Sequence, residues 1–274
     1  MNPNPSLDTA DLRRPLRLRT NLWWSLYGVW HRHVRVYCKT LLANATPPVL
    51  EPLFFFVAIA YGLGGFMPTD GFDGLPYRSY VAAGMLVSSA MFTGMFETMY
   101  GTFVRLVYQK TYDAMLSTHL RIREMFVGEL LFAASKGAVF ATVVLLVTML
   151  LGARPTIWCM LVPVVGFATA YLFACLGLIV TSYVKMINNF SFFATGVMTP
   201  LFYFSGTFFP IRGRSVLLDV ISELMPLPAP LELSRALFKA QFTWETLMHL
   251  GILIVYGVIL HIFALRRMTA RVLR

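Results

Sequence analysis

The segment that decides the fold is RLVYQKTYDAMLSTHLRIRE, residues 105–124, the most polar stretch in the middle of the chain. Long apolar runs flank it on both sides, which predicts a loop outside a membrane. Within it Tyr112, Met115 and Leu116 follow the i, i+3, i+4 spacing that gathers side chains on one helix face. Charged residues surround this apolar patch. The segment therefore suits a short helix that docks in a groove of another protein, or one that rests on the membrane surface.

The composition indicates that lipid is the solvent of most of the chain. Of the 274 residues, 57% are hydrophobic and 13% are charged, and the mean hydropathy is +0.66. Soluble domains carry roughly a quarter charged residues. The net charge of +10 comes without a basic motif for reading nucleic acid. We therefore expect the positive side chains to meet membrane lipids and not nucleic acid.

Six apolar segments have about the 20 residues that a helix needs to cross a bilayer. We predict an all-α integral membrane protein with one domain over residues 23–265. Residues 23–42, rich in tryptophan and cations, predict an amphipathic helix in the membrane interface. Residues 1–22 predict a flexible cytoplasmic tail, and residues 266–274 a second cytoplasmic tail. The predicted spans are 48–66, 79–103, 127–151, 157–183, 190–209 and 246–265.

Lysine and arginine orient these spans, because positive residues concentrate on cytoplasmic loops. With the N-terminus inside, 16 of the 23 face the cytoplasm, six face outward and Lys136 lies within a span. Both termini and the segment 105–124 are then cytoplasmic, and the loop 210–245 is outside. Prolines divide that loop into two short apolar helices, which suit a re-entrant hairpin or a pair of interfacial helices. Their apolar residues are Val216, Leu217, Val220, Ile221 and Leu224, then Leu231, Leu233, Leu237 and Phe238.

The fifth predicted span, FSFFATGVMTPLFYFSGTFF (190–209), carries eight aromatic residues. Pro200 at its centre frees backbone carbonyls, while Gly196 and Gly206 permit close helix approach. The rings suit a gate on the pathway of a large amphiphile, and packing against neighbouring helices explains them as well. The candidate pathway residues are Met198, Thr199, Pro200, Phe202, Phe204, Ser205, Phe208 and Phe209.

Two charged residues fall well inside predicted spans, Glu97 and Lys136, while Glu51 and Glu129 lie near span ends. Counted from the cytoplasmic ends of their spans they lie roughly 9 and 13 Å deep. Because consecutive spans are usually neighbours and an isolated charge at that depth is costly, we predict a Glu97–Lys136 ion pair. The alternative is that Glu97 caps backbone groups and Lys136 extends to the interface alone.

Residue constellations for catalysis and for metal binding are absent from the sequence. There is no HExxH, no nucleophile elbow and no Walker A motif. Cys159 and Cys175 lie sixteen residues apart in one apolar run, about 24 Å along a helix, which is too far for a disulfide. We therefore expect no enzyme, no metal and no cofactor on this chain. The few ionisable residues at mid-depth also disfavour a secondary transporter.

Three motifs resemble a known family of membrane proteins. QKTYDAML (109–116), ASKG (134–137) and MTPLFYFSGTFFP (198–210) resemble the nodulation-factor (lipo-oligosaccharide) export permeases, a subfamily of the type-2 ABC exporter permeases. The resemblance covers nearly everything after residue 20. His119 departs from it, because this subfamily is expected to carry a proline at that point of the loop.

The resemblance implies a bacterial inner-membrane homodimer that works with two copies of a separate P-loop ATPase, which holds ATP and magnesium. The aromatic span would line the pathway of an amphiphilic cargo: a lipo-oligosaccharide, another glycolipid or a lipid-linked polysaccharide. A drug efflux permease is the alternative cargo class, and a membrane enzyme or assembly factor lacks any acid, base or metal cluster. The implied ATPase-coupling residues are Lys110, Thr111, Tyr112, Asp113, Met115 and Leu116.

Overall fold

The computed structural model describes residues 21–67, 71–118, 120–210 and 225–273, and these are almost entirely helical. The helices in chain order are α1 (Leu22–Lys39), α2 (Leu41–Gly62), α3 (Tyr77–Phe96), α4 (Thr111–Leu116), α5 (Ile122–Leu150), α6 (Val162–Tyr183), α7 (Asn189–Phe193), α8 (Thr199–Tyr203), α10 (Pro228–Lys239) and α11 (Trp244–Val272). Short 3₁₀ turns cover Gly64–Phe66 and Ile157–Leu161, and π-helical segments cover Glu97–Gly101, Val104–Tyr108 and Ala194–Met198.

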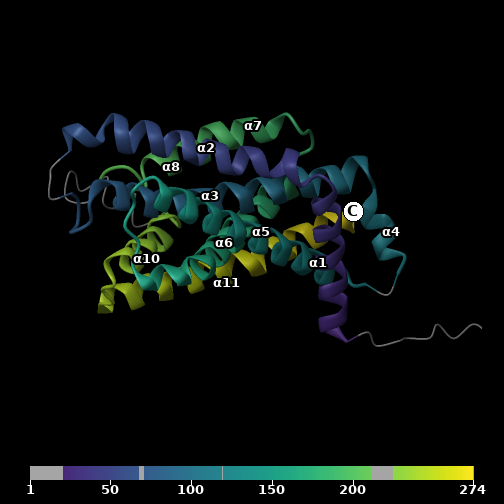
Figure 1. Ribbon diagram of the computed structural model, residues 1–274. Coiled ribbons are helices and arrows are strands. Elements are labelled where there is room, and N and C mark those ends of the chain that lie inside the picture. Colours follow the sequence, from purple (N-terminus) through teal and green to yellow (C-terminus); the bar gives the residue numbers. More distant parts are fainter. Residues whose placement is uncertain (1–20, 68–70, 119, 211–224, 274) are drawn as a thin grey trace, which may run out of the picture.

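The long helices run side by side, and α1 lies across one end of them (Figure 1). That end also carries α4 and the C-terminus, whereas α10 lies towards the opposite end. The crosswise course of α1 is the one expected of an interfacial helix. If the bundle stands upright in a membrane, α1, α4 and the C-terminal end of α11 share one membrane face.

Four helical stretches of the described residues are long and apolar enough to cross a bilayer. They are Tyr77–Tyr108, Ile122–Leu150, Ile157–Tyr183 and Trp244–Val272, with Leu50–Phe66 as a shorter apolar helix. Each matches a predicted span. The count of six spans stays a prediction, because α2 passes this length test only as the shorter stretch.

The fifth predicted span differs from a simple helix over 190–209. The chain is helical from Asn189 to Tyr203, through α7, a π segment and α8, and then turns. Gly206 takes a φ of +85°, a left-handed conformation that glycine adopts without steric cost. Its carbonyl accepts hydrogen bonds from Tyr80 and from Arg235 of α10. These bonds hold the turn, so the aromatic motif ends as a folded-back segment.

The loop 210–245, predicted to lie outside, is described mainly in its second half, from residue 225. There α10 is mostly buried between α3, α6 and α11, with Leu231, Leu233 and Leu237 turned inward. The guanidinium of Arg235 also lies 3.8 Å from the ring centroid of Tyr80. The first apolar stripe, from Val216 to Leu224, lies outside the described residues, and the re-entrant course of the loop stays a prediction.

The core of the bundle is the contact of α3 with α5 and α6. Nearly all of α3 is buried, and close approach there depends on small residues. A Cβ added to Gly94 would stand 2.2 Å from the carbonyl oxygen of Ala170. The Thr98 hydroxyl donates to the carbonyl of Ala174 across the same interface at 2.9 Å. Glycine and threonine thus bring α3 and α6 into backbone contact, as small residues do between membrane helices.

We expect Gly94→Ala to lower the stability of the purified permease by about 1–3 kcal/mol, because the methyl group overpacks the α3–α6 contact. Gly251→Ala on α11 is the matched control, since a Cβ there meets nothing within 4 Å. Denaturant or thermal unfolding in the same detergent measures both. Equal stability of the two variants would contradict this account of the core.

Candidate functional site

The short helix predicted within residues 105–124 is present as α4, but its apolar residues do not form an exposed patch. Tyr112 is 1% exposed and Met115 is 8% exposed, and Leu116 is half-buried. Tyr112 packs edge-on against Phe126 of α5. The prediction of a protruding apolar surface is wrong, because a periodic apolar face serves equally well to anchor a helix to its own protein. The surface of α4 is formed instead by Lys110, Asp113, Ala114, Ser117 and Thr118.

Tyr112 connects α4 to a charged cluster inside the bundle. Its hydroxyl donates to Glu129 Oε2 of α5 at 2.5 Å, and Thr102 donates to the other oxygen at 2.7 Å. The guanidinium of Arg105 binds Glu129 and also Glu97, the latter at 3.1 Å. Burial, and then the neighbouring Glu129 carboxylate, raise the pKa of the Tyr112 phenol well above its ordinary value. The phenol therefore stays protonated and able to donate.

Glu97 also meets Lys136, the partner predicted from the sequence. Lys136 Nζ lies 2.9 Å from Glu97 Oε2, with side-chain exposures of 13% and 11%. The structure thus brings these two residues together, and it adds four that the sequence reasoning did not place beside them. Thr102 and Tyr112 are two of these. The others are Arg105, interpreted from the sequence as a loop residue, and Glu129, interpreted as lying near a span end. The polar cluster, as we name it, is Thr102, Glu97, Arg105, Tyr112, Glu129 and Lys136.

The π-helical turns explain how Arg105 reaches Glu97. In a regular α-helix residues eight apart point about 80° away from each other. A π turn closes with an i→i+5 bond and so holds one residue more. Two such segments, Glu97–Gly101 and Val104–Tyr108, replace the regular path here and extend the helix to Tyr108. The wider turns bring both side chains to one face, and no pattern in the sequence announces them.

A cavity of about 500 Å³ lies beside the polar cluster, between α2, α3 and the α7–α8 segment. Aromatic rings line it, among them Phe55, Phe92, Phe96 and Phe202. Hydroxyl groups of Ser88, Ser89, Thr93, Thr195 and Thr199 alternate with the rings, and Glu97 and Lys136 also contribute to the wall. We call this space the aromatic cavity. Its walls combine rings, hydroxyls and one ion pair, which suits an amphiphile.

Of the candidate pathway residues, Thr199 and Phe202 line the aromatic cavity. Phe208 packs on Phe202 with ring centroids 5.1 Å apart, and so supports the wall from behind. Phe204 is 54% exposed and Phe209 is 39% exposed. Met198 and Ser205 are buried, and Pro200 is half-buried in the first turn of α8. The eight residues therefore divide into a cavity wall, its support and an exposed face.

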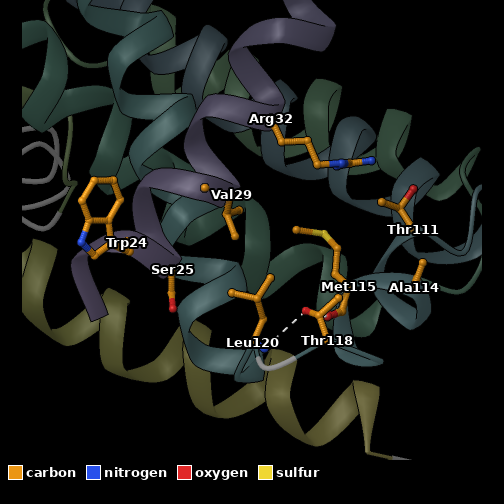
Figure 2. Close-up of a pocket in the computed structure, with 10 residues that line it drawn as sticks. Trp24, Ser25, Val29, Arg32, Thr111, Ala114, Met115, Thr118 and Leu120 are labelled. Carbon is orange, nitrogen blue, oxygen red and sulfur yellow. Dashed lines mark hydrogen bonds between the residues drawn. The ribbon is translucent and has the colours of Figure 1, made fainter. Parts of the chain in front are cut away.

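A second hollow, of about 450 Å³, lies between α1 and α4. Figure 2 shows Trp24 and Val29 of α1 on one side and Met115 and Leu120 on the other. Its lining is mostly apolar, with Arg32, Thr111 and Thr118 adding polar groups. We call it the α1–α4 groove. It opens at the end of the bundle where α4 lies.

The polar cluster yields an asymmetric prediction for Glu97 and Lys136. Removing Glu97 strands Lys136, so Glu97→Gln should cost about 3 kcal/mol of stability. Lys136→Met should cost less, because Arg105 remains beside Glu97. The double variant should lose less than the two single losses together. Unfolding of the three purified variants measures this coupling, and strictly additive losses would show that the contact has no energetic weight.

Comparison with known proteins identifies the family to which this architecture belongs. The family profile described as ABC-2 type transporter matches residues 25–239. Nodulation protein J of Rhizobium leguminosarum bv. viciae is 32% identical over 250 residues, which cover 90% of this chain and 95% of the relative. Nodulation protein J of Rhizobium meliloti (strain 1021) is 31% identical over 239 residues, 86% of this chain and 89% of the relative.

A more distant relative is the inner membrane transport permease YadH of Escherichia coli (strain K12). It is 21% identical over 209 residues, covering 75% of this chain and 79% of the relative. The resemblance inferred from the three sequence motifs is thereby confirmed. The chain belongs to the ABC-2 type transporter family, as a multi-pass membrane permease subunit of an ABC exporter that works with an ABC ATPase and is not itself a catalytic enzyme.

Proposed function

We propose that this permease exports an amphiphilic glycolipid, such as a lipo-oligosaccharide or a lipid-linked polysaccharide, across the bacterial inner membrane. The observation that carries the proposal is the aromatic cavity. Its rings offer flat apolar faces to sugar and acyl groups, and its serine and threonine hydroxyls offer hydrogen bonds to a polyhydroxylated headgroup. The relatives named nodulation protein J support the same class of cargo.

In this proposal the working unit is a homodimer with two ATPase subunits, and both termini face the cytoplasm. ATP and magnesium are held by the ATPase. The ATPase docks on the exposed face of α4 together with the α1–α4 groove, since these lie at one end of the bundle and combine polar and apolar surface. ATP-driven movement of the ATPase pair would shift the permeases between inward-open and outward-open states.

A chain of contacts links α4 to the wall of the aromatic cavity, so movement of α4 would be transmitted to it. Tyr112 of α4 holds Glu129, which holds Arg105, and Arg105 holds Glu97 in the cavity wall. The Tyr112–Glu129 bond is buried and the two Arg105 contacts are partly buried, so each is worth more than the same contact in water. The polar cluster thus supports a role for Tyr112 as a positioning residue between ATPase and cargo, in place of the docking role predicted from the sequence.

Docking is tested by Ala114→Asp, which adds a carboxylate to the exposed face of α4. Burying that unpaired charge under the ATPase is costly, so we expect at least about a tenfold loss of ATPase affinity. Ala240→Asp is the matched control, an exposed alanine directly after α10, which lies towards the opposite end of the bundle. Co-purification and binding titration of the cognate ATPase measure both. Wild-type affinity of the Ala114 variant would exclude docking at this face.

The cargo pathway is tested by Phe96→Ala, which removes a ring that lines the aromatic cavity yet is already 37% exposed. We expect ATP-dependent transport of the glycolipid into inverted vesicles to fall about tenfold, because stacking surface is lost at the bound cargo. Phe204→Ala is the control, since Phe204 is exposed outside the cavity. A larger loss with Phe204 would move the pathway to the exposed face of α8.

The aromatic cavity also suits a hydrophobic drug, the alternative cargo. The hydroxyl groups discriminate between the two, because an apolar drug gains nothing from them. Replacing Ser88 by alanine removes one hydroxyl from the wall. Reduced glycolipid transport with unchanged dye efflux would favour the glycolipid, and the opposite result would favour a drug.

A further inference from the structure

A third cavity, of about 410 Å³, lies on the other side of the polar cluster, between α1 and the cytoplasmic ends of α3 and α5. It shares Glu97, Tyr100, Gly101 and Lys136 with the aromatic cavity. The rest of its wall includes Arg32, His33, Tyr37, Gln109 and Phe132. We call it the α1 cavity. It also shares Arg32 with the α1–α4 groove, but the export proposal assigns the cavity itself no ligand.

The charges around the α1 cavity do not balance. Arg105 and Lys136 are paired with the carboxylates Glu97 and Glu129. Arg32 has no acidic partner within 4 Å in the described part of the chain. Burial lowers the pKa of His33 to about 4, so the imidazole is neutral near pH 7. Three cations, Arg32, Arg105 and Lys136, are therefore matched by two carboxylates, and the net charge around the cavity is +1.

Unsatisfied polar atoms gather in the same wall. Of seven buried side-chain nitrogen and oxygen atoms without a hydrogen-bond partner among the described residues, three belong to it. They are His33 Nε2, the Tyr37 hydroxyl and Arg105 Nε. Burial raises the pKa of Tyr37 to about 12, so its hydroxyl keeps its proton. Buried polar atoms are ordinarily paired, and a cluster of exceptions calls for a ligand.

The three buried atoms without a hydrogen-bond partner and the guanidinium of Arg32 can all donate hydrogen bonds. Arg105 Nε and the Tyr37 hydroxyl are donors, His33 Nε2 donates in one tautomer, and Arg32 donates several charged hydrogen bonds. A ligand that accepts from all of them is an oxyanion with one negative charge, which would also cancel the excess positive charge. The three orphan atoms are covered in this structure, so binding requires the rings of Tyr37 and His33 to turn towards the cavity.

The position of the cavity identifies the source of the oxyanion. It adjoins α1, whose tryptophans Trp23 and Trp24 are 75% and 71% exposed and which lies across the end of the bundle (Figure 1). An interfacial helix of this kind lies at the level of the lipid headgroups. We propose that the α1 cavity binds the phosphodiester of a phospholipid from the cytoplasmic leaflet, with Arg32 as its principal ligand. The proposal rests on the interfacial placement of α1 and not on the identity of the cargo.

The test measures lipid binding to the full-length permease in detergent. Native mass spectrometry detects the bound lipid, and the melting temperature is followed as lipid is added. Phosphatidylglycerol is the probe, and monoglucosyl diacylglycerol, which has equivalent chains and no phosphate, is the comparison lipid. We expect retention of phosphatidylglycerol and not of the glucolipid. Equal retention of the two lipids would overturn the proposal, because the site would then recognise chains only.

Variants locate the site. Arg32→Gln removes the unpaired cation and should weaken phosphatidylglycerol binding about tenfold or more, as the loss of a charge-assisted hydrogen bond does. Arg35→Gln is the matched control, since it removes an equal charge one turn along α1 from an exposed position outside the cavity. Tyr37→Phe removes one hydroxyl at constant shape and should weaken binding severalfold. Equal effects of the two arginine variants would mean diffuse surface attraction and would refute the site.

Inorganic phosphate separates a lipid site from a site for small anions. We expect millimolar phosphate to leave phosphatidylglycerol binding unchanged within twofold, because it lacks the acyl chains. Saturable phosphate binding without lipid binding would overturn the lipid assignment. ATPase docking and glycolipid transport are measured separately. Lipid binding to the α1 cavity can therefore be judged even if the export proposal fails.

Discussion

The contact on which the rest of the structure depends is the buried bond of Glu129 to Arg105. A carboxylate that is wholly buried in a membrane bundle is tolerated only when donors surround it. Glu129 obtains them from a guanidinium, a threonine and a tyrosine, all within residues 102–112. The need to satisfy this one carboxylate fixes the end of the helix that continues from α3, the start of α5 and the position of α4. The aromatic cavity and the α1 cavity share Glu97 and Lys136 of the polar cluster, and Thr111 and Met115 of the α1–α4 groove lie beside Tyr112.

The sequence predicts the long elements well and the inner arrangement only in part. Apolar runs of helical length locate α3, α5, α6 and α11, because lipid requires continuous hydrogen-bonded helices. Depth counting also places Glu97 beside Lys136. Periodicity could not tell which partner Tyr112 and Met115 face, since the same spacing serves an internal core and a docking surface. It also could not show that Glu129 accepts from three donors, because these lie 17 to 27 residues before it and reach it only once α4 and α5 have packed.

The folded-back end of the aromatic motif could not be predicted from the sequence either. Residues 190–209, with eight aromatic side chains and one proline, predict a membrane span. The turn after Tyr203 depends on Arg235, which lies 29 residues beyond Gly206 and donates to its carbonyl. Contacts at that separation follow from tertiary packing and leave no local signal. The family match covers residues 25–239, but the interior of the bundle is built from such long-range contacts.

The wide turns beyond α3 affect how this protein tolerates change in its gene. A π turn is an α-helix with one residue inserted. Loss of a single codon within Glu97–Gly101 would convert that segment into a regular α turn and leave the residues beyond it close to their present orientation. Arg105 would then lie seven residues from Glu97, about 20° around the helix, and would still share a face with it. The same loss within the regular turns of α3 would rotate everything beyond it by about 100° and turn both residues away from α5.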